Sequence, residues 1–290
     1  MPSNLFKKKH AVFLTTTLFF AGLNHATAAE NIPPPNDLLN ATLWMQTSVE
    51  YKANVLATYN LAKARLDQAL KDSQWTALPT LQGDHYTKLP PAIIADCDET
   101  LIDNSVYEAH LIKTGKSYSS KEWSSYVADE AASAMPGAVE FMQYAASKGV
   151  TIFYITNRKK ADEASTYNNM KALGFPMGDG KVDTLLTKGE KKDWGSAKGS
   201  RDAVVAKDYR VLLMLGDNLG DFTDRASGSL EERMAAYTAD KEHWGKDWLM
   251  FPNPAYGSFE SAAFGGNYGL PSSERRAMKI DALQAWSPKN

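Results

Sequence analysis

Short apolar runs separated by helix-like segments fill the middle of the chain. The apolar runs lie at residues 92–95, 150–155, 182–186, 211–215 and 248–251. Segments with the apolar spacing or the end signals of helices lie between them, at 136–149, 161–173 and 202–207. Continuous apolar runs of this length are typical of strands buried on both faces, as in parallel sheets. The alternation therefore predicts an α/β fold in which a parallel sheet lies between two layers of helices.

A helical pattern precedes this region. From Leu38 to Leu70 apolar residues recur at three- and four-residue spacings, which predicts a long helix or a helical pair outside the sheet. Its expected apolar face contains Leu39, Leu43, Val49, Leu56, Tyr59, Leu66 and Leu70. We assign residues 29–85, an extended arm followed by these helices, and an insertion at about 107–130 to a smaller helical cap domain. The core then spans 86–257, and the tail at 258–290 either joins the cap or follows the core.

The first residues have the pattern of an export signal. Lys7, Lys8 and Lys9 precede an apolar stretch at 11–23, and Ala26-Thr27-Ala28 supplies small residues for a signal peptidase. We expect residues 1–28 to be a cleaved signal peptide and the mature protein to be periplasmic or secreted. The apolar stretch is too short to span a bilayer comfortably, so no membrane span is expected.

Length, charge and cysteine content limit the number of domains and the kinds of partner that the protein can have. The chain has 290 residues, 43% of them hydrophobic, which allows one to two domains. Removing residues 1–28 takes away three lysines and no acids, so the formal charge falls from −2 to −5 and no nucleic-acid partner is expected. The single cysteine, Cys97, excludes an intrachain disulfide. The oligomeric state, a homodimer included, is left open.

Two acids, Asp96 and Asp98, stand where the first predicted strand ends. Burying an unpaired carboxylate is costly, whereas beside a divalent cation both can stay ionised. The pattern D-x-D-x-T alone is equally compatible with a helix N-cap and turn. An EF-hand is excluded, because Leu101 and Tyr107 occupy the positions that need Gly and Glu. Cys97 between the acids is predicted to point into the core rather than to act as a nucleophile.

More polar residues follow the later strands. Thr156-Asn157-Arg158 ends the second run, and Gly216-Asp217-Asn218-Leu219-Gly220-Asp221-Phe222 follows the fourth. A lysine-rich stretch between them contains Lys188, Lys191, Lys192 and Lys198. If the strands are parallel, all these ends meet at one edge of the sheet. Carboxylates for a cation, together with hydroxyl, amide and ammonium donors for an anion, indicate phosphoryl transfer.

As an ordered set, these motifs resemble a known family. The matching segments are Asp96-Cys97-Asp98-Glu99-Thr100-Leu101-Ile102-Asp103-Asn104-Ser105, Pro136-Gly137-Ala138-Val139-Glu140-Phe141, Ile155-Thr156-Asn157-Arg158, Lys198-Gly199-Ser200-Arg201, Gly216-Asp217-Asn218-Leu219 and Pro252-Asn253-Pro254-Ala255-Tyr256-Gly257. They resemble the haloacid dehalogenase superfamily of aspartyl-phosphate hydrolases and, within it, the class C acid phosphatases of the lipoprotein e(P4) family. The resemblance runs from about residue 90 to 260. It implies a Rossmann-like haloacid dehalogenase fold with a cap, and a phosphoric monoester hydrolase of the acid phosphatase or 5′-nucleotidase type.

The resemblance also implies roles for the acids. Asp96 would be the nucleophile that forms a phosphoaspartate, and Asp98 the general acid and base. Asp96 and Asp217 would bind a metal ion directly, Asp98 through its backbone carbonyl, and Asp221 would sit in or beside the metal shell. Oxygen ligands in such number favour Mg²⁺.

Other residues would bind the substrate. Thr156 and Lys198 would hold the transferring phosphoryl group, with Asn157 in support. Lys198 fits the family pattern Lys-x-x-Arg before Gly-Asp-Asn, while Lys188 remains an alternative because it follows a strand end. Two aromatic residues, Trp123 and Tyr256, have two possible roles. Their rings either stack on the base or aryl group of a substrate or pack within the cap.

The sequence thus predicts an exported, Mg²⁺-dependent phosphatase for phosphate monoesters such as nucleoside 5′-monophosphates and aryl phosphates. Many relatives carry a lipid-modified cysteine just after the signal, and this chain has none there, so no membrane anchor is expected. The alternatives are a non-enzymatic storage protein on the same fold, a periplasmic ligand-binding protein, and another haloacid dehalogenase-type hydrolase. The presence of Asp96 argues against the first and the export signal against the last.

Overall fold

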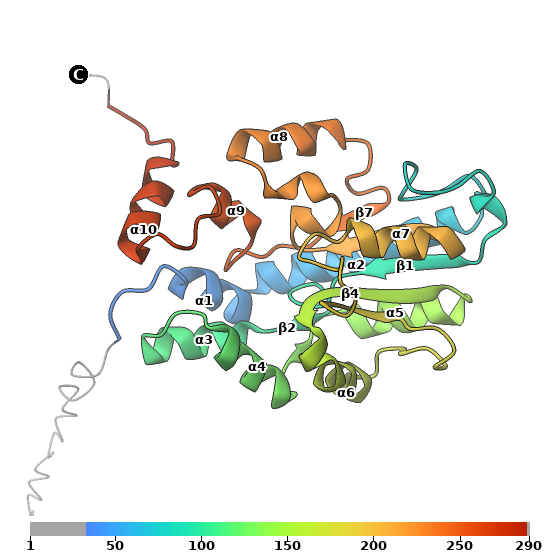
Figure 1. The fold of residues 1–290 in the computed structure, drawn as a ribbon, viewed down its shortest axis with the longest axis horizontal. Helices are drawn as coiled ribbons and strands as arrows, with labels where there is room; N and C mark the ends of the chain where they lie inside the picture. Colours follow the sequence, from blue (N-terminus) through green and yellow to red (C-terminus); the bar gives the residue numbers. More distant parts are fainter. Residues whose placement is uncertain (1–32, 289–290) are drawn as a thin grey trace, which may run out of the picture.

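A five-stranded parallel sheet forms the centre of the computed structural model, which describes residues 33–288 (Figure 1). In spatial order its strands are β5 (Leu185–Lys188), β4 (Thr151–Lys159), β1 (Pro91–Ala95), β6 (Arg210–Gly216) and β7 (Trp248–Met250). Each neighbouring pair is parallel. The predicted α/β class and parallel sheet are therefore confirmed. The predicted signal peptide at 1–28 lies outside the described residues.

Both faces of the sheet are apolar and covered. Successive strand residues point to opposite faces, so Ile93 and Leu213 enter one core while Ile94 and Met214 enter the other. The first face is covered by α2 (Val49–Ala69), α5 (Ala138–Ser147) and α6 (Glu163–Leu173), and the second by α7 (Gly199–Asp208) (Figure 1). Burial on both faces is the reason that the strands are continuous apolar runs in the sequence.

The predicted helical pair exists, and α2 covers one face of the sheet rather than standing apart from it in a cap. Ser48 separates α1 (Leu39–Thr47) from α2, and its hydroxyl accepts a hydrogen bond from Tyr51 N at 3.0 Å. α2 packs on α5 and β6, and so belongs to the core layer. Its buried stripe consists of Tyr51, Val55, Tyr59, Ala62, Leu66 and Ala69. The predicted apolar face was wrong at four exposed positions, Leu39, Leu43, Val49 and Leu56.

The error at α2 has a simple physical reason. Its buried stripe recurs at steps of three and four and mixes aromatic, aliphatic and small residues, with Val55 and Leu66 buried, whereas Val49, Leu56 and Leu61 are exposed. A prediction based mainly on the large aliphatic residues therefore misses part of the buried face of α2.

A helical insertion rises from a short antiparallel stem after β1. The stem pairs β2 (Ile102–Asp103) with β3 (Ser133–Ala134), and α3 (Ser105–Thr114) and α4 (Ser120–Ala128) lie between them. α1 packs against α3. The C-terminal helices α9 (Ser258–Ala262) and α10 (Ser272–Asp281) lie at the same end of the molecule, where Arg276 Nε donates to Asp37 Oδ2 at 3.1 Å (Figure 1).

Two strand boundaries differ from the prediction. β4 continues to Lys159 and so includes Thr156-Asn157-Arg158, because Thr156 pairs with Thr187 and Lys159 with Lys188 of β5. β5 begins at Leu185 rather than at residue 182. The remaining elements are η3 (Tyr86–Lys88), η4 (Lys160–Asp162), η5 (Leu219–Asp221), η6 (Asp224–Ser227) and α8 (Leu230–Ala239).

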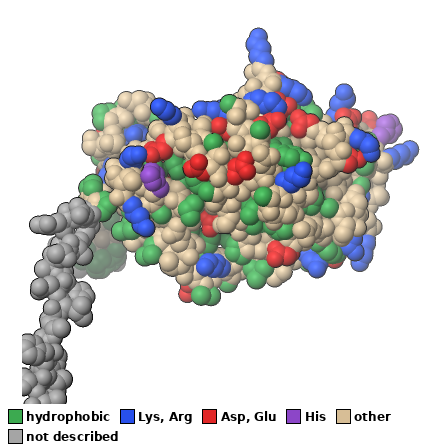
Figure 2. Space-filling view, turned by 90° about the horizontal axis from the view of Figure 1, so that it is seen from below, with side chains coloured by type: hydrophobic (Ala, Val, Ile, Leu, Met, Phe, Trp, Pro, Cys, Tyr) green, Lys and Arg blue, Asp and Glu red, His purple; other side chains and the backbone are tan. Residues whose placement is uncertain are grey.

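Across residues 33–288, no helix combines the length and the apolar character needed to cross a membrane. On the face shown in Figure 2, acidic and basic side chains are interspersed, with hydrophobic side chains between them. That face therefore has a mixed charge rather than one dominant sign.

Candidate active site

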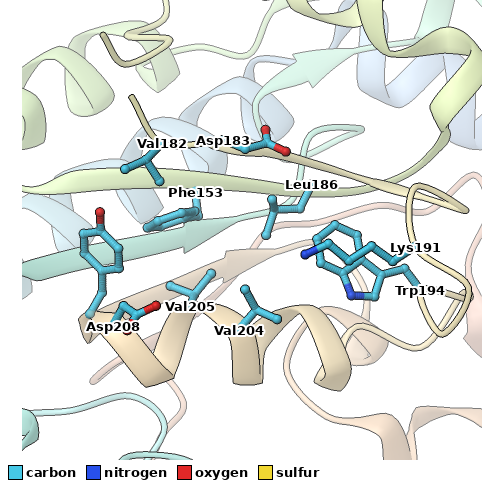
Figure 3. Close-up of a pocket in the computed structure, with 10 residues that line it drawn as sticks. Phe153, Val182, Asp183, Leu186, Lys191, Trp194, Val204, Val205 and Asp208 are labelled. Atoms are coloured by element: carbon cyan, nitrogen blue, oxygen red, sulfur yellow. The ribbon is translucent and has the colours of Figure 1, made fainter. Parts of the chain in front are cut away.

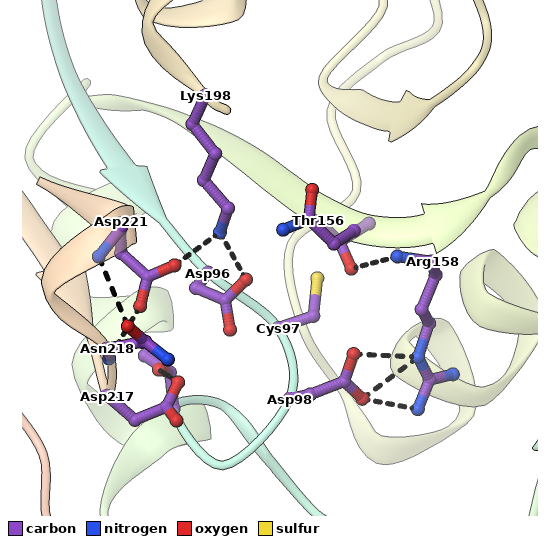
Figure 4. A network of polar contacts seen from close by, with 12 residues as sticks. Asp96, Cys97, Asp98, Thr156, Arg158, Lys198, Asp217, Asn218 and Asp221 are labelled. Atoms are coloured by element: carbon purple, nitrogen blue, oxygen red, sulfur yellow. Dashed lines mark hydrogen bonds and ion pairs between the residues drawn. The ribbon is translucent and has the colours of Figure 1, made fainter. Parts of the chain in front are cut away.

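Three carboxylates converge where β1 and β6 end. Asp96 follows β1, and its backbone N–H donates to Leu215 O of β6 at 2.9 Å. Asp217 follows β6, and Asp221 ends the short helix η5. Ligand oxygens of the three aspartates all lie within 4.8 Å of one another (Figure 4). The cluster lies at the carboxyl edge of the sheet, where open α/β folds bind their ligands.

The local sequence explains why Asp217 and Asp221 meet. Asn218 forms a capping box, in which its backbone N–H donates to Asp221 Oδ2 at 2.8 Å. Gly216 allows the close approach, because a Cβ added there would lie 2.3 Å from Asp221 Cβ. Asn253 fixes Asp217 from another segment, since its Nδ2 donates to Asp217 Oδ2 at 2.8 Å.

Lys198 supplies the positive charge of the cluster. Its Nζ forms ion pairs with Asp96 and, at 2.8 Å, with Asp221 Oδ1, and only 2% of its side chain is exposed. Burial alone would lower the pKa of Lys198, but Asp221 and Asp96 raise it, so the ammonium stays charged. The alternative residue, Lys188, instead donates to Ser196 Oγ at 2.6 Å. The structure thus brings Lys198 to the carboxylates.

The charge balance of the cluster fits a divalent cation. Burial, with repulsion from Asp221 and Asp98, raises the pKa of Asp96 to about 7 despite the attraction of Lys198. Burial also raises the pKa of Asp217 well above its usual value, as do Asp221 and Asp96. One ammonium therefore does not compensate three clustered carboxylates. The residues that could hold a hard cation through oxygen are Asp96, Asp217 and Asp221.

The two acids flanking Cys97 point in different directions (Figure 4). The Asp98 carboxylate turns toward Arg158, whose Nη2 donates to Asp98 Oδ1 at 2.8 Å. Cys97 is fully buried, with its Sγ 3.8 Å from Met170 Sδ, which confirms its predicted place in the core. Burial raises the pKa of the Cys97 thiol and so opposes a nucleophilic role.

Thr156 and Asn157 lie on opposite faces of β4. Thr156 is buried, and its Oγ1 accepts a hydrogen bond from Arg158 N at 3.0 Å (Figure 4). Asn157 is exposed, and its Nδ2 donates to Ser196 O at 3.1 Å while its Oδ1 accepts from Arg201 Nη2 at 2.9 Å. Asn157 therefore supports the loop that precedes Lys198, at the start of α7.

Trp123 and Tyr256 contact neighbours of the acids. The Trp123 ring lies over the Arg158 guanidinium, with 5.5 Å from Cζ to the ring centroid. The Tyr256 hydroxyl donates to the Glu99 carboxylate. Each of the two aromatic residues thus contacts a charged side chain beside the site. Their role in substrate recognition is taken up as a proposal below.

Several residues that sequence reasoning did not select complete the network. Glu99 is fully buried at φ 55° and accepts from Asn104 N at 2.8 Å. Arg201 is fully buried and donates from Nη1 to Thr156 O at 2.6 Å. Both residues lie inside segments that match the family, and that position was the usable signal in the sequence.

Residues 15–259 match the family described as HAD superfamily, subfamily IIIB (Acid phosphatase). The structure is similar to the class C acid phosphatase from Bacillus anthracis with tungstate bound, at 34% identity and a TM-score of 0.76, over 86% of this chain and 98% of that one. A second structure of the class C acid phosphatase from that organism gives 34% identity and a TM-score of 0.75, again over 86% of this chain and 98% of that one. The chain belongs to this acid phosphatase family. The predicted resemblance is confirmed, and the protein is a phosphoric monoester hydrolase with the haloacid dehalogenase fold.

A separate pocket of the phosphatase lies between β5 and α7, away from the acids. It has a volume of about 210 Å³ and apolar walls that include Phe153, Leu186, Trp194 and Val205 (Figure 3). None of the predicted site residues lines it. The pocket is therefore separate from the aspartate cluster.

We expect the metal-free phosphatase to lose stability as the pH rises. Burial raises the pKa values of Asp96 and Glu108 to about 7 and that of Asp202 to about 8. The folded state then binds more protons than the unfolded state above about pH 4, so the free energy of unfolding falls from there to about pH 8. Thermal unfolding in EDTA at about pH 5 and about pH 8 measures this.

Metal binding should reverse part of this loss. An added divalent cation replaces protons on the clustered carboxylates, so Mg²⁺ should raise the Tm more at about pH 8 than at about pH 5. An equal shift at both pH values would contradict the assignment of Asp96 and Asp217 as ligands.

Proposed function

We propose that this acid phosphatase is an exported, Mg²⁺-dependent enzyme that prefers nucleoside 5′-monophosphates and aryl phosphates and works through a phosphoaspartate. The observation that carries the proposal is the convergence of Asp96, Asp217 and Asp221 with Lys198 at one edge of the sheet. The related Bacillus anthracis enzyme with tungstate bound supports an oxyanion site in this fold, because tungstate and phosphate are both tetrahedral oxyanions.

In the first step a carboxylate oxygen of Asp96 attacks phosphorus in line with the ester oxygen. The bond between phosphorus and the ester oxygen breaks, and the departing oxygen takes a proton from Asp98. Lys198 and Thr156 would hold the phosphoryl oxygens, with the buried Lys198 ammonium balancing their charge. The products are the free alcohol and a phosphoaspartate on Asp96.

In the second step water attacks the phosphorus of the phosphoaspartate. Asp98, now a carboxylate, takes the proton of that water, and the bond between phosphorus and the Asp96 oxygen breaks. Inorganic phosphate leaves, and both acids return to their starting states. A Mg²⁺ ion held by Asp96, Asp217 and Asp221 would keep Asp96 ionised and neutralise charge on the phosphoryl group.

A substrate panel on the purified protein tests the proposal. Phosphate release from adenosine 5′-monophosphate, p-nitrophenyl phosphate and glycerol 2-phosphate should require a divalent cation and stop in EDTA. Binding without turnover would favour a ligand-binding or storage protein. Release of halide from a haloacid, with no phosphate release, would favour another hydrolase of the superfamily.

Export is tested separately. We infer cleavage after Ala28 from the pattern of charged, apolar and small residues that precedes it. N-terminal sequencing of the protein from the periplasm and the medium should begin at Ala29, and an intact Met1 in the cytosol would contradict the inference.

The proposed substrate preference predicts a specific effect at Tyr256. Tyr256→Ala should lower kcat/KM for adenosine 5′-monophosphate and p-nitrophenyl phosphate by about 5- to 150-fold, because a ring stack contributes about 1–3 kcal/mol. Glycerol 2-phosphate, which has no ring, should change far less. Tyr256→Phe is the matched control, since it keeps the ring and loses only the hydrogen bond to Glu99. Equal losses on all three substrates would show that Tyr256 serves packing rather than recognition.

A further inference from the structure

A buried arginine holds the Asp98 carboxylate. Arg158 donates from Nη2 to Asp98 Oδ1 at 2.8 Å and from Nε to the two oxygens at 3.0 and 3.2 Å (Figure 4). Asn104 Nδ2 donates to the same Oδ1 at 2.8 Å. The Arg158 side chain is 2% exposed and that of Asp98 17%. Planar donors of this kind fix both the position and the rotation of a carboxylate.

Arg158 is in turn fixed from the core and from the insertion above it. Its Nη1 donates to Thr166 Oγ1 of α6 at 3.3 Å, and its Nη2 donates to Asn104 Oδ1 at 3.1 Å. Trp123 of α4 covers its guanidinium, and Tyr126 of the same helix donates to Asn104 Oδ1 at 3.2 Å. The orientation of the arginine therefore depends on the segment between β2 and β3 as well as on the sheet.

We propose that Arg158, together with Asn104, is a positioning residue that aims the Asp98 carboxyl at the oxygen of the leaving group. The inference rests on the proposed function, in which Asp98 gives up a proton in one step and takes one in the next. Because Asp98 acts in both steps, its carboxyl has to occupy the same position in each, and the contacts that hold it affect the rate of both steps. Within residues 33–288, the ion pair that Arg158 forms is with Asp98 and not with the three clustered aspartates.

A double-mutant cycle tests this role. Asp98→Asn and Arg158→Met should each lower kcat on glycerol 2-phosphate by about 100- to 1,000-fold, with KM changed by less than about threefold. If Arg158 acts only through Asp98, the double variant should lose no more than Asp98→Asn alone. Losses that multiply would overturn the proposal. A raised KM with unchanged kcat would also overturn it, since Arg158 would then bind the substrate.

Two further measurements separate positioning from a structural effect. Arg158→Met should slow the first-turnover release of 2,4-dinitrophenolate from its phosphate ester far less than alcohol release from glycerol 2-phosphate, because that phenolate leaves without a proton. Arg158→Lys should recover about tenfold of the lost kcat, since it restores one donor but not the planar pair. Equal losses on both esters, with no recovery in Arg158→Lys, would contradict positioning.

Controls keep the test decisive. Asn104→Ala keeps the ion pair between Arg158 and Asp98 but removes one donor to Asp98 and one acceptor for Arg158, so it should give the same leaving-group pattern at smaller amplitude even if Arg158→Met folds poorly. Arg225→Met, which removes an exposed ion pair with Asp240, should leave both esters unaffected. If the wild type hydrolyses neither ester, the proposed function fails. If it hydrolyses both and the Arg158 pattern is absent, only this inference fails.

Discussion

Asp96→Asn is expected to abolish turnover and leave the protein folded. The amide has nearly the shape of the carboxylate but is neither a nucleophile nor a good cation ligand, so kcat should fall by more than about a thousandfold. Folding should persist because Lys198 keeps its second ion pair, to Asp221 Oδ1 at 2.8 Å. Phosphate release and circular dichroism measure the two outcomes.

The same variant makes a thermodynamic prediction. Because the pKa of Asp96 is raised to about 7, its ionisation destabilises the metal-free fold at neutral pH. Asp96→Asn should therefore be at least as stable as the wild type in EDTA, while the stabilisation by Mg²⁺ should shrink. Asp179→Asn, an exposed aspartate paired with Lys181, is the control and should change neither quantity. Retention of more than a few per cent of wild-type turnover by Asp96→Asn would move the nucleophile elsewhere.

The meeting of the acids at one edge of the sheet was predictable, because in a parallel sheet all strands end at the same edge. Once the apolar runs indicate parallel strands, residues that follow different runs have to meet, and the structure brings Asp96 and Asp217 together. Lys198 could be preferred over Lys188 only through the resemblance, because both lie in the same lysine-rich stretch. In the structure Lys198 lies immediately before α7 and forms an ion pair with Asp96, whereas Lys188 bonds Ser196.

The partner of Asp98 was harder to predict. The apolar pattern placed Thr156-Asn157-Arg158 at the end of the strand, and only Thr156 and Asn157 were assigned a role there, in phosphate binding. Pairing with β5 at Thr156 and Lys159 extends β4 past these residues through an irregular step, in which Asn157 is exposed while Arg158 is buried and meets Asp98. The position of α2 was missed for a related reason, since the sequence shows two overlapping apolar stripes and only tertiary packing selects one.

Lys198→Met should lower both turnover and stability strongly, because it removes the cation of the cluster while keeping most of the length of the side chain. Turnover should fall by about 100- to 1,000-fold through the lost stabilisation of phosphoryl charge. The metal-free variant should also unfold more easily at neutral pH, since removing one partner of a buried ion pair costs about 3–5 kcal/mol. Lys188→Met is the matched control, because Lys188 bonds Ser196 rather than an aspartate.

The pH dependence of Lys198→Met distinguishes an electrostatic effect from poor packing. Without the ammonium, the remaining repulsion raises the pKa of Asp96 further, so acid should restore stability as that carboxyl takes up a proton. Mg²⁺ should restore stability at neutral pH by supplying the missing positive charge. A loss of stability that neither acid nor Mg²⁺ reverses would mean that the methylene chain of Lys198, rather than its charge, holds this edge of the sheet together.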